Sequence, residues 1–163
     1  MKQNYTSAAT SINSTKLPRI YNSFGIRGNI FDYGCGRFTD HLKEAVRAAG
    51  FEWWGMDKFN QSPEFNQRSM MEAHDVSYVF CSNVLNVIDS NEVVAEVVAN
   101  LHHIAAMHDA AVVVTIYEGD RSGIGRVTKA DCFQRNEVLR DYLPYFEGFA
   151  SVKLERGCIV ARV

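Results

Sequence analysis

The fold is decided by the stretch Asn29-Ile30-Phe31-Asp32-Tyr33-Gly34-Cys35-Gly36. Its first five residues form a short apolar run typical of a strand, and two glycines follow at once. A helical pattern then begins near Thr39 or Asp40 and ends at Gly50. Glycines between a strand and a helix let the backbone approach a ligand closely and leave the first amides of the helix pointing at it. The stretch therefore predicts a nucleotide-type ligand site.

Outward from this stretch, short strand-like runs alternate with longer helical patterns, which favours an α/β fold with a mostly parallel sheet. The expected parallel strands are 29–33, 52–56, 76–82 and 110–117. Two further strands, 150–154 and 158–163, are joined only by Glu155-Arg156-Gly157. So short a connection predicts that these two strands form an antiparallel hairpin.

Three more helices are expected from their starting signals. Ser62-Pro63-Glu64 combines an N-cap residue with proline at the first helical position and predicts a helix over 63–72. Asp89 is the expected cap of a helix that continues to about residue 107. Thr128-x-x-Asp131 is expected to open another helix, with its apolar face formed by Phe133, Leu139, Tyr142 and Leu143.

The composition indicates one globular domain covering residues 1–163. Hydrophobic residues make up 47% and charged residues 22% of the chain, both near the globular average. The longest apolar stretches, such as 110–116, are far shorter than the roughly 20 residues of a membrane-spanning helix, so a cytoplasmic protein without a membrane partner is expected. The four cysteines lack a C-x-x-C pair, which favours reduced, mostly buried thiols over a metal site.

Charge is distributed unevenly along the chain. Residues 1–30 carry four basic and no acidic side chains, whereas residues 31–110 carry 12 acidic and 5 basic ones. A second basic region, 119–140, contains Arg121 and Arg126. A solubilising scatter of charge is one explanation; the other is that both regions meet an anionic partner.

Asp57 gives the glycine turn a more specific meaning. It ends the second expected strand, 25 residues after Asp32, where a carboxylate can accept hydrogen bonds from both hydroxyls of a ribose. A dinucleotide fingerprint would require a third glycine where this chain has Thr39, which disfavours NAD. A P-loop of the form Gly-x-x-x-x-Gly-Lys-Ser/Thr is absent from the sequence.

These residues resemble motifs of the Rossmann-like, class I S-adenosylmethionine-dependent methyltransferases. Phe31-Asp32-Tyr33-Gly34-Cys35-Gly36 looks like their motif I, and Gly55-Met56-Asp57 looks like their acidic second motif. Residues 81–88 resemble their fourth-strand segment, and the closing hairpin matches their reversed hairpin. The resemblance implies a three-layer sandwich. Because only about twenty residues separate Asp57 from Val76, the third strand is expected to be short or missing.

A narrower similarity involves proteins associated with DNA phosphorothioation that resemble methyltransferases. It is carried by the strand-one motif, the run Val84-Leu85-Asn86-Val87-Ile88, and the segment from Gly125-Arg126-Val127-Thr128 to Cys132-Phe133-Gln134.

The resemblance implies a set of site residues. S-adenosylmethionine is the implied cofactor, bound by Asp32, Tyr33, Gly34, Cys35, Gly36, Asp57, Lys58, Ser82, Asn83 and Val84. Catalytic roles are implied for Asn83, Tyr117 and Glu118, and acceptor binding for Asn86, Arg121 and Arg126. The carboxylate that commonly holds the adenine amino group has only candidates here: Glu72, Asp75 and, as a polar substitute, His74. No metal is expected.

The leading hypothesis is a methyltransferase acting on an anionic acceptor, either a nucleic acid or a phosphorylated metabolite. On this hypothesis the N-terminal basic segment, residues 1–28, lies on the substrate side and converges with the basic region 119–140. The alternative is a non-catalytic S-adenosylmethionine-binding subunit or sensor. A third hypothesis is a nucleotide-binding oxidoreductase.

Overall fold

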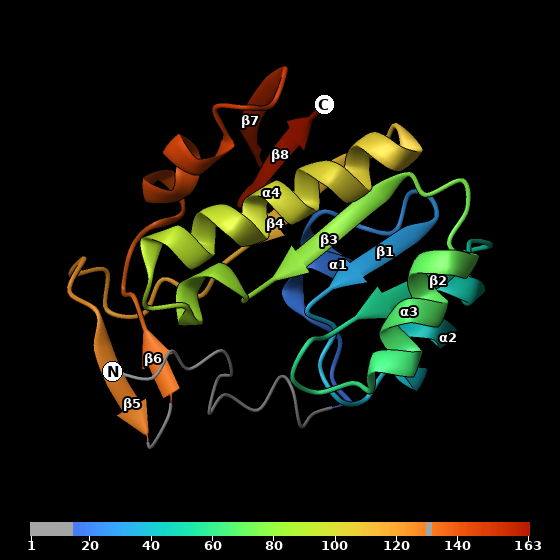
Figure 1. Ribbon diagram of the computed structural model, residues 1–163, viewed down its shortest axis with the longest axis horizontal. Coiled ribbons are helices and arrows are strands. Elements are labelled where there is room, and N and C mark those ends of the chain that lie inside the picture. Colours follow the sequence, from blue (N-terminus) through green and yellow to red (C-terminus); the bar gives the residue numbers. More distant parts are fainter. Residues whose placement is uncertain (1–14, 130–131) are drawn as a thin grey trace.

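A six-stranded, mostly parallel sheet forms the centre of the protein (Figure 1). The computed structural model describes residues 15–129 and 132–163. The strand order is β2-β1-β3-β4-β8-β7, in which the first four strands are parallel and the last two antiparallel. These strands are β1 (Ile30–Tyr33), β2 (Trp53–Met56), β3 (Tyr78–Ser82), β4 (Ala111–Thr115), β7 (Ser151–Glu155) and β8 (Cys158–Arg162). The expected α/β class, parallel strands and closing hairpin are confirmed.

Helices fill the connections between the strands. The α-helices are α1 (Arg19–Ser23), α2 (Asp40–Ala48), α3 (Pro63–Glu72) and α4 (Asn91–His108), and the 3-10 helices are η2 (Leu85–Val87) and η3 (Leu139–Phe146). The Ser62 hydroxyl caps α3 by accepting from the Phe65 N–H, as predicted. The cap of α4 is Ser90, which accepts from the Val93 N–H, so the prediction of Asp89 was one residue too early.

Within the described residues, no strand lies between β2 and β3 in the sequence. Residues 57–77 form α3 and loops, and β3 therefore pairs directly with β1, with Phe31 opposite Val79. This agrees with the expectation of a short or missing third strand. Its consequence is that β2 is an edge strand, one step away from the glycine turn that follows β1.

Each face of the sheet packs in its own hydrophobic cluster, because successive strand residues point to opposite faces. Val79 and Val112 point to the face where α4 and η3 pack. Phe80 and Val113 point to the other face, against α1 and α2. In Figure 1, α4 lies in front of the sheet and α1 behind it. This packing leaves the carboxyl ends of β1, β2 and β3 at one edge, where their loops meet.

The segment after β4 differs from the prediction. In place of a helix opened by Thr128, the chain forms β5 (Arg126–Lys129) and β6 (Cys132–Gln134), an antiparallel pair that we call the ribbon, followed by η3. Asp131 lies outside the described residues. Asn136 has a φ of +57°, which a right-handed helix cannot contain, and Val127 and Thr128 favour extended backbone. The predicted apolar face survives only in η3, where Tyr142 is fully buried.

Candidate functional site

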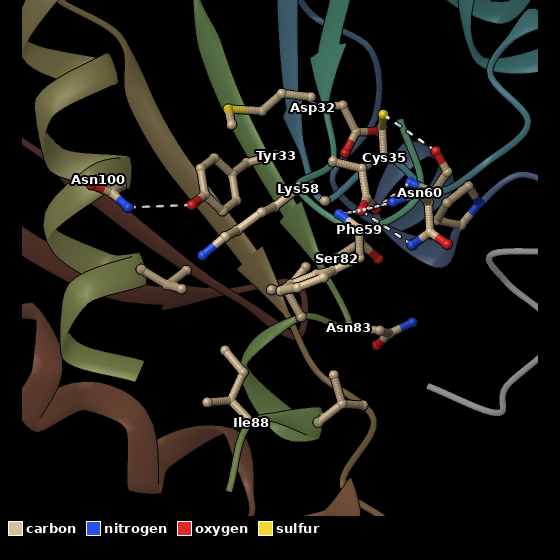
Figure 2. Close-up of a pocket in the computed structure, with 18 of the residues that line it drawn as sticks. Asp32, Tyr33, Cys35, Lys58, Phe59, Asn60, Ser82, Asn83, Ile88 and Asn100 are labelled. Carbon is tan, nitrogen blue, oxygen red and sulfur yellow. Dashed lines mark hydrogen bonds between the residues drawn. The ribbon is translucent and has the colours of Figure 1, made fainter. Parts of the chain in front are cut away.

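A pocket opens at the edge of the sheet where the carboxyl ends of β1, β2 and β3 meet (Figure 2). The space between its walls is about 1140 Å³ when the part open to solvent is included. All ten residues that the sequence assigned to cofactor binding line it. They are Asp32, Tyr33, Gly34, Cys35, Gly36, Asp57, Lys58, Ser82, Asn83 and Val84. Residues from three separate segments of the chain are thus brought to one cavity.

The glycine turn after β1 forms the floor of this pocket. Gly34 and Gly36 have φ values of +81° and +79°, a backbone conformation that favours glycine. The Gly34 N–H donates to the Met56 carbonyl at 2.7 Å and so holds the turn against β2. A Cβ atom on Gly34 would lie 2.4 Å from Cγ2 of Val84, far inside contact distance. The turn therefore tolerates no side chain at this position.

The Asp57 carboxylate ties the loops around the pocket together. Its Oδ2 accepts from the Gly36 N–H at 2.9 Å. Its Oδ1 accepts from the Phe59 and Asn60 backbone N–H groups at 3.0 and 2.9 Å, and from the Asn60 side chain at 3.1 Å. Three of these hydrogen bonds fall on Oδ1 and only one on Oδ2, so Oδ2 is the oxygen that can accept another from a ligand. Asp57 thus shapes the pocket as well as lining it.

Asp32 lies beneath the glycine turn with only 2% of its surface exposed. The Tyr21 hydroxyl donates to its Oδ2, and the indole N–H of Trp53 donates to the Tyr21 oxygen at 2.9 Å. Burial disfavours the charged carboxylate and raises the pKa of Asp32 to about 7, although the Tyr21 hydrogen bond opposes this shift. Tyr21 is a contributor that the sequence analysis did not identify.

This buried carboxyl makes the stability of the protein depend on pH. An Asp in the unfolded chain titrates near 3.9, so the folded state binds this proton more tightly and loses stability as the pH rises toward 7. Between about pH 6 and pH 8 the loss amounts to about 1.4 kcal/mol in the free energy of unfolding. Urea unfolding of the parent and of Asp32→Asn at both pH values measures it. If the two proteins lose the same free energy of unfolding, Asp32 is not the group responsible.

Asn83 ends β3 at the pocket in a constrained backbone conformation. Its φ is +56°, and its N–H donates to the Thr115 carbonyl at 2.9 Å. Next to it, the Ser82 hydroxyl accepts from the Thr115 hydroxyl at 3.1 Å. A residue held at positive φ beside a cavity is a common feature of ligand sites, although the same conformation also serves the turn that leads into η2. The position of Asn83 is therefore compatible both with ligand binding and with a role in this turn.

One wall of the pocket comes from α4, which the sequence analysis did not assign to the site. Its contribution consists of Val93, Glu96, Val97 and Asn100. The Asn100 side chain donates to the Tyr33 hydroxyl at 3.4 Å (Figure 2). None of the adenine candidates Glu72, His74 and Asp75 lines the pocket, because all three precede β3, at the opposite edge of the sheet. Glu96 is the carboxylate that α4 brings instead.

Four of the other predicted residues lie outside the pocket: Tyr117, Glu118, Arg121 and Arg126. The Tyr117 side chain follows β4 and is 63% exposed. The Glu118 carboxylate is engaged elsewhere, because it pairs with Arg121 at 2.7 Å and accepts from the Leu139 N–H at 3.0 Å. Tyr117, Glu118 and Arg121 belong to the loop between β4 and the ribbon, and Arg126 begins β5.

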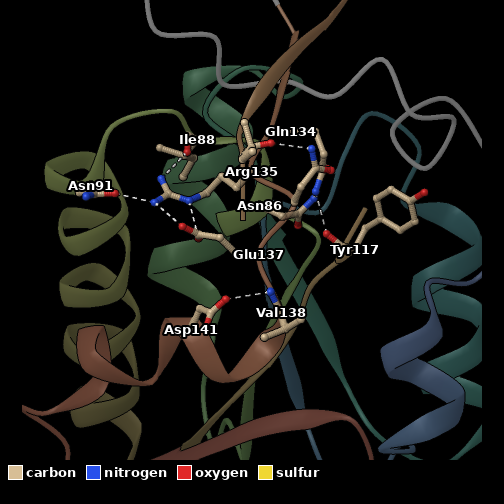
Figure 3. A network of polar contacts seen from close by, with 11 residues as sticks. Asn86, Ile88, Asn91, Tyr117, Gln134, Arg135, Glu137, Val138 and Asp141 are labelled. Atoms are coloured by element: carbon tan, nitrogen blue, oxygen red, sulfur yellow. Dashed lines mark hydrogen bonds and ion pairs between the residues drawn. The ribbon is translucent and has the colours of Figure 1, made fainter. Parts of the chain in front are cut away.

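Asn86 is also outside the pocket and serves a structural network (Figure 3). It is 2% exposed, and its amide donates to the Gln134 side chain at 3.1 Å. The buried Arg135 donates from its backbone to the Asn86 carbonyl at 2.9 Å and from its guanidinium to the Ile88 carbonyl at 2.8 Å. The prediction that Asn86 faces the acceptor is not supported. Its burial allows it instead to fasten the ribbon to the pocket wall formed by Val87 and Ile88.

The first basic segment is described only in part. Of the first segment, residues 1–14 lie outside them. The remainder includes α1, which packs on one face of the sheet, whereas η3, where the second basic region ends, packs on the other. Arg27 pairs with Glu155 at 3.6 Å at the end of β7. The hydrophobic face of α1 thus places Arg19–Ser23 behind the sheet, and the convergence of the two basic regions stays a prediction.

Within residues 15–129 and 132–163, no three His, Cys, Asp or Glu side chains are arranged to hold a metal ion. Among the helices described, none combines the length and apolar character needed to cross a membrane. No protein-family model matches the chain, and a search of curated proteins finds no match.

Proposed function

We propose that this protein is an S-adenosylmethionine-dependent methyltransferase with a Rossmann-like three-layer fold. The observation that carries the proposal is the pocket itself, into which the glycine turn, Asp57 and the end of β3 all project. The strand order gives further support, since the parallel strands end in an antiparallel hairpin that NAD-binding Rossmann domains lack. Helices on both faces of the sheet agree with the three-layer arrangement.

The pocket residues suit the parts of this cofactor. The glycine turn leaves room for a ligand beside the backbone, and the remaining acceptor position on Asp57 suits a ribose hydroxyl. The buried carboxyl of Asp32 suits a cationic ligand, which would favour its ionised form. When bound, S-adenosylmethionine supplies a methyl group on a sulfonium, and the protein's main task is to hold the acceptor in line with it. Asn83, at the pocket rim, is the residue we assign to that alignment.

A non-catalytic cofactor-binding subunit is the second candidate, and one observation favours it. The acidic residues that line the pocket are Asp32, Asp57 and Glu96. Asp32 is buried and Asp57 already accepts four hydrogen bonds, while Glu118 is engaged outside the pocket. An acceptor that must lose a proton would find few bases here.

Calorimetry with S-adenosylmethionine, S-adenosylhomocysteine and NAD tests the cofactor assignment. We expect the first two to bind and NAD not to bind; the reverse would establish the oxidoreductase hypothesis. Release of S-adenosylhomocysteine on incubation with a cell extract then distinguishes an enzyme from a binding subunit. The extract fraction that takes up labelled methyl groups identifies the acceptor class.

The side chains of Arg121 and Arg126 provide a test of whether the acceptor is anionic. Arg121 and Arg126 are exposed and lie outside the pocket, so Arg121→Ala with Arg126→Ala should leave the affinity for S-adenosylmethionine unchanged. If both contact phosphates of a single strand, the slope of log affinity against log salt concentration should become shallower by about 1.4. Methyl transfer to the nucleic-acid fraction, measured over a salt series, provides the slope. An unchanged slope would exclude both arginines from the acceptor site.

A further inference from the structure

Exposed aromatic side chains gather at the edge where the pocket opens. Among the residues that the structure describes, the Phe, Tyr and Trp side chains exposed to solvent are Phe38 (45%), Phe59 (46%) and Tyr117 (63%). Both tryptophans are buried. Exposing a large ring to water is unfavourable, so three rings at one edge need an explanation.

Chain connectivity places these rings at the same end of the sheet. Phe38 follows the glycine turn after β1, Phe59 follows Asp57 after β2, and Tyr117 follows β4. Because these strands are parallel, all three rings lie beyond the same edge of the sheet.

Specific contacts agree with this placement. The Gln61 side chain donates to the carbonyls of Gly36 and Arg37 at 2.8 and 3.0 Å, which joins the loops that carry Phe38 and Phe59. Phe59 lines the pocket itself. In Figure 3 the ring of Tyr117 points away from the Asn86–Gln134 network.

Cations accompany the rings. Arg37 and Lys58 directly precede Phe38 and Phe59, and the Lys58 ammonium lies 5.6 Å from the centre of the Phe59 ring. Arg126, nine residues after Tyr117 at the start of the ribbon, is also exposed. Asp120 accepts from the Ser122 N–H within its own loop, and both this contact and the charge of Arg126 lower the pKa of its carboxyl. The edge thus offers apolar rings and positive charge side by side.

We propose that this edge binds single-stranded nucleic acid, with bases stacked on Phe38, Phe59 and Tyr117 and phosphates near Arg37, Lys58 and Arg126. Rings interleaved with cations suit unpaired nucleotides because every base has a flat face and every linkage a negative charge. The strands from β2 to β4 span three neighbour spacings of about 4.8 Å, or roughly 14 Å, which a few nucleotides can cover. That this strand is also the methyl acceptor rests on the proposed function.

Stacking requires bases that are not already stacked and paired. A duplex presents its phosphates to the cations but keeps its bases from the rings, so it should bind more weakly than a single strand of the same sequence. An abasic strand retains the phosphates and lacks the flat faces. Comparing these ligands separates stacking from charge alone.

Fluorescence anisotropy with labelled oligonucleotides of about 20 residues tests the proposal. The probes are single-stranded DNA, RNA of the same sequence, the DNA duplex and an abasic DNA strand. We expect the single-stranded DNA, the RNA, or both to bind at least about tenfold more tightly than the duplex and the abasic strand. The ratio of the DNA and RNA affinities then identifies which of the two is the natural ligand. Phe38→Ala with Tyr117→Ala should weaken single-strand binding by about tenfold or more and leave abasic binding unchanged.

Met71→Ala with Met107→Ala is the matched control. Both methionines are exposed and lie near the ends of α3 and α4, at the opposite edge of the sheet. We expect this variant to bind single strands like the parent. Equal affinity for all four probes, no binding at about 50 mM salt, or equal losses in the two double variants would overturn the proposal.

Calorimetry with S-adenosylmethionine on the same preparations distinguishes a failure of the nucleic-acid proposal from a failure of the proposed function. Phe38 and Tyr117 do not line the pocket, so their double variant should bind the cofactor normally. Cofactor binding without oligonucleotide binding would overturn only the nucleic-acid surface. Oligonucleotide binding without cofactor binding would overturn only the methyltransferase assignment.

Discussion

Gly34→Val should abolish S-adenosylmethionine binding, lowering the affinity by at least about a hundredfold. Two effects combine at this position. The φ of +81° is unfavourable for any residue with a Cβ, and that Cβ would lie 2.4 Å from Cγ2 of Val84. Relieving the collision requires moving the glycine turn or the loop after β3, both of which line the pocket. Calorimetry measures the affinity, and urea unfolding measures the accompanying loss of stability.

Gly50→Val is the matched control for this substitution. Gly50 has a nearly equal φ of +88°, but a Cβ there would meet no atom within 4 Å. The control therefore introduces the same kind of backbone strain, on the order of 1–3 kcal/mol, without a collision and away from the pocket. We expect it to lower the free energy of unfolding and leave cofactor affinity unchanged. If folded Gly34→Val binds the cofactor as well as Gly50→Val does, the pocket does not hold S-adenosylmethionine.

Asp57→Ala should weaken both the fold and the cofactor complex. The substitution removes an acceptor for three backbone N–H groups, those of Gly36, Phe59 and Asn60. Leaving a buried donor without a partner costs roughly 1–3 kcal/mol, so the free energy of unfolding should fall by at least about 2 kcal/mol. Losing hydrogen bonds between a charged group and the ribose should weaken binding by a further 1.5–3 kcal/mol or so. Urea unfolding and calorimetry measure the two effects separately.

Asn60→Ala serves as the control for the structural part. It removes the side-chain donor to Asp57 and leaves the carboxylate in place. We expect a smaller loss of stability and nearly normal cofactor affinity. A folded Asp57→Ala protein with the parent's affinity would show that Asp57 organises the loops but does not contact a ribose.

The grouping of the site residues could be predicted because it follows from connectivity. Asp32, Asp57 and Ser82 lie in or directly after strand-like runs, and parallel strands bring their carboxyl ends to one edge. No knowledge of side-chain contacts is needed for that step. The position of Gly34 was predictable for the same reason, since a turn between a strand and a helix has little freedom in where it can lie.

Other parts of the site could not be predicted because they depend on packing between distant segments. Tyr21 reaches Asp32 only because α1 packs behind the sheet. Glu96 lines the pocket because of how α4 is rotated, and its helical repeat predicts only which face is apolar. The signal Thr128-x-x-Asp131 has the right spacing for a helix cap. The structure instead has extended backbone at Val127, in β5, and a positive φ at Asn136, so no helix begins there.

The missing strand beside β2 has a kinetic consequence. Among the strands that the structure describes, β2 pairs only with β1, yet the loop that follows it holds the Gly36 N–H through Asp57. An edge strand can separate from its single neighbour while the remaining strands stay paired, so this margin can open without global unfolding. A ligand bound between the loop after β1 and the loop after β2 would prevent this opening. The ligand could in turn dissociate only when the margin opens. The residence time of the ligand would then follow the opening rate of the sheet margin, which amide hydrogen exchange in β2 reports.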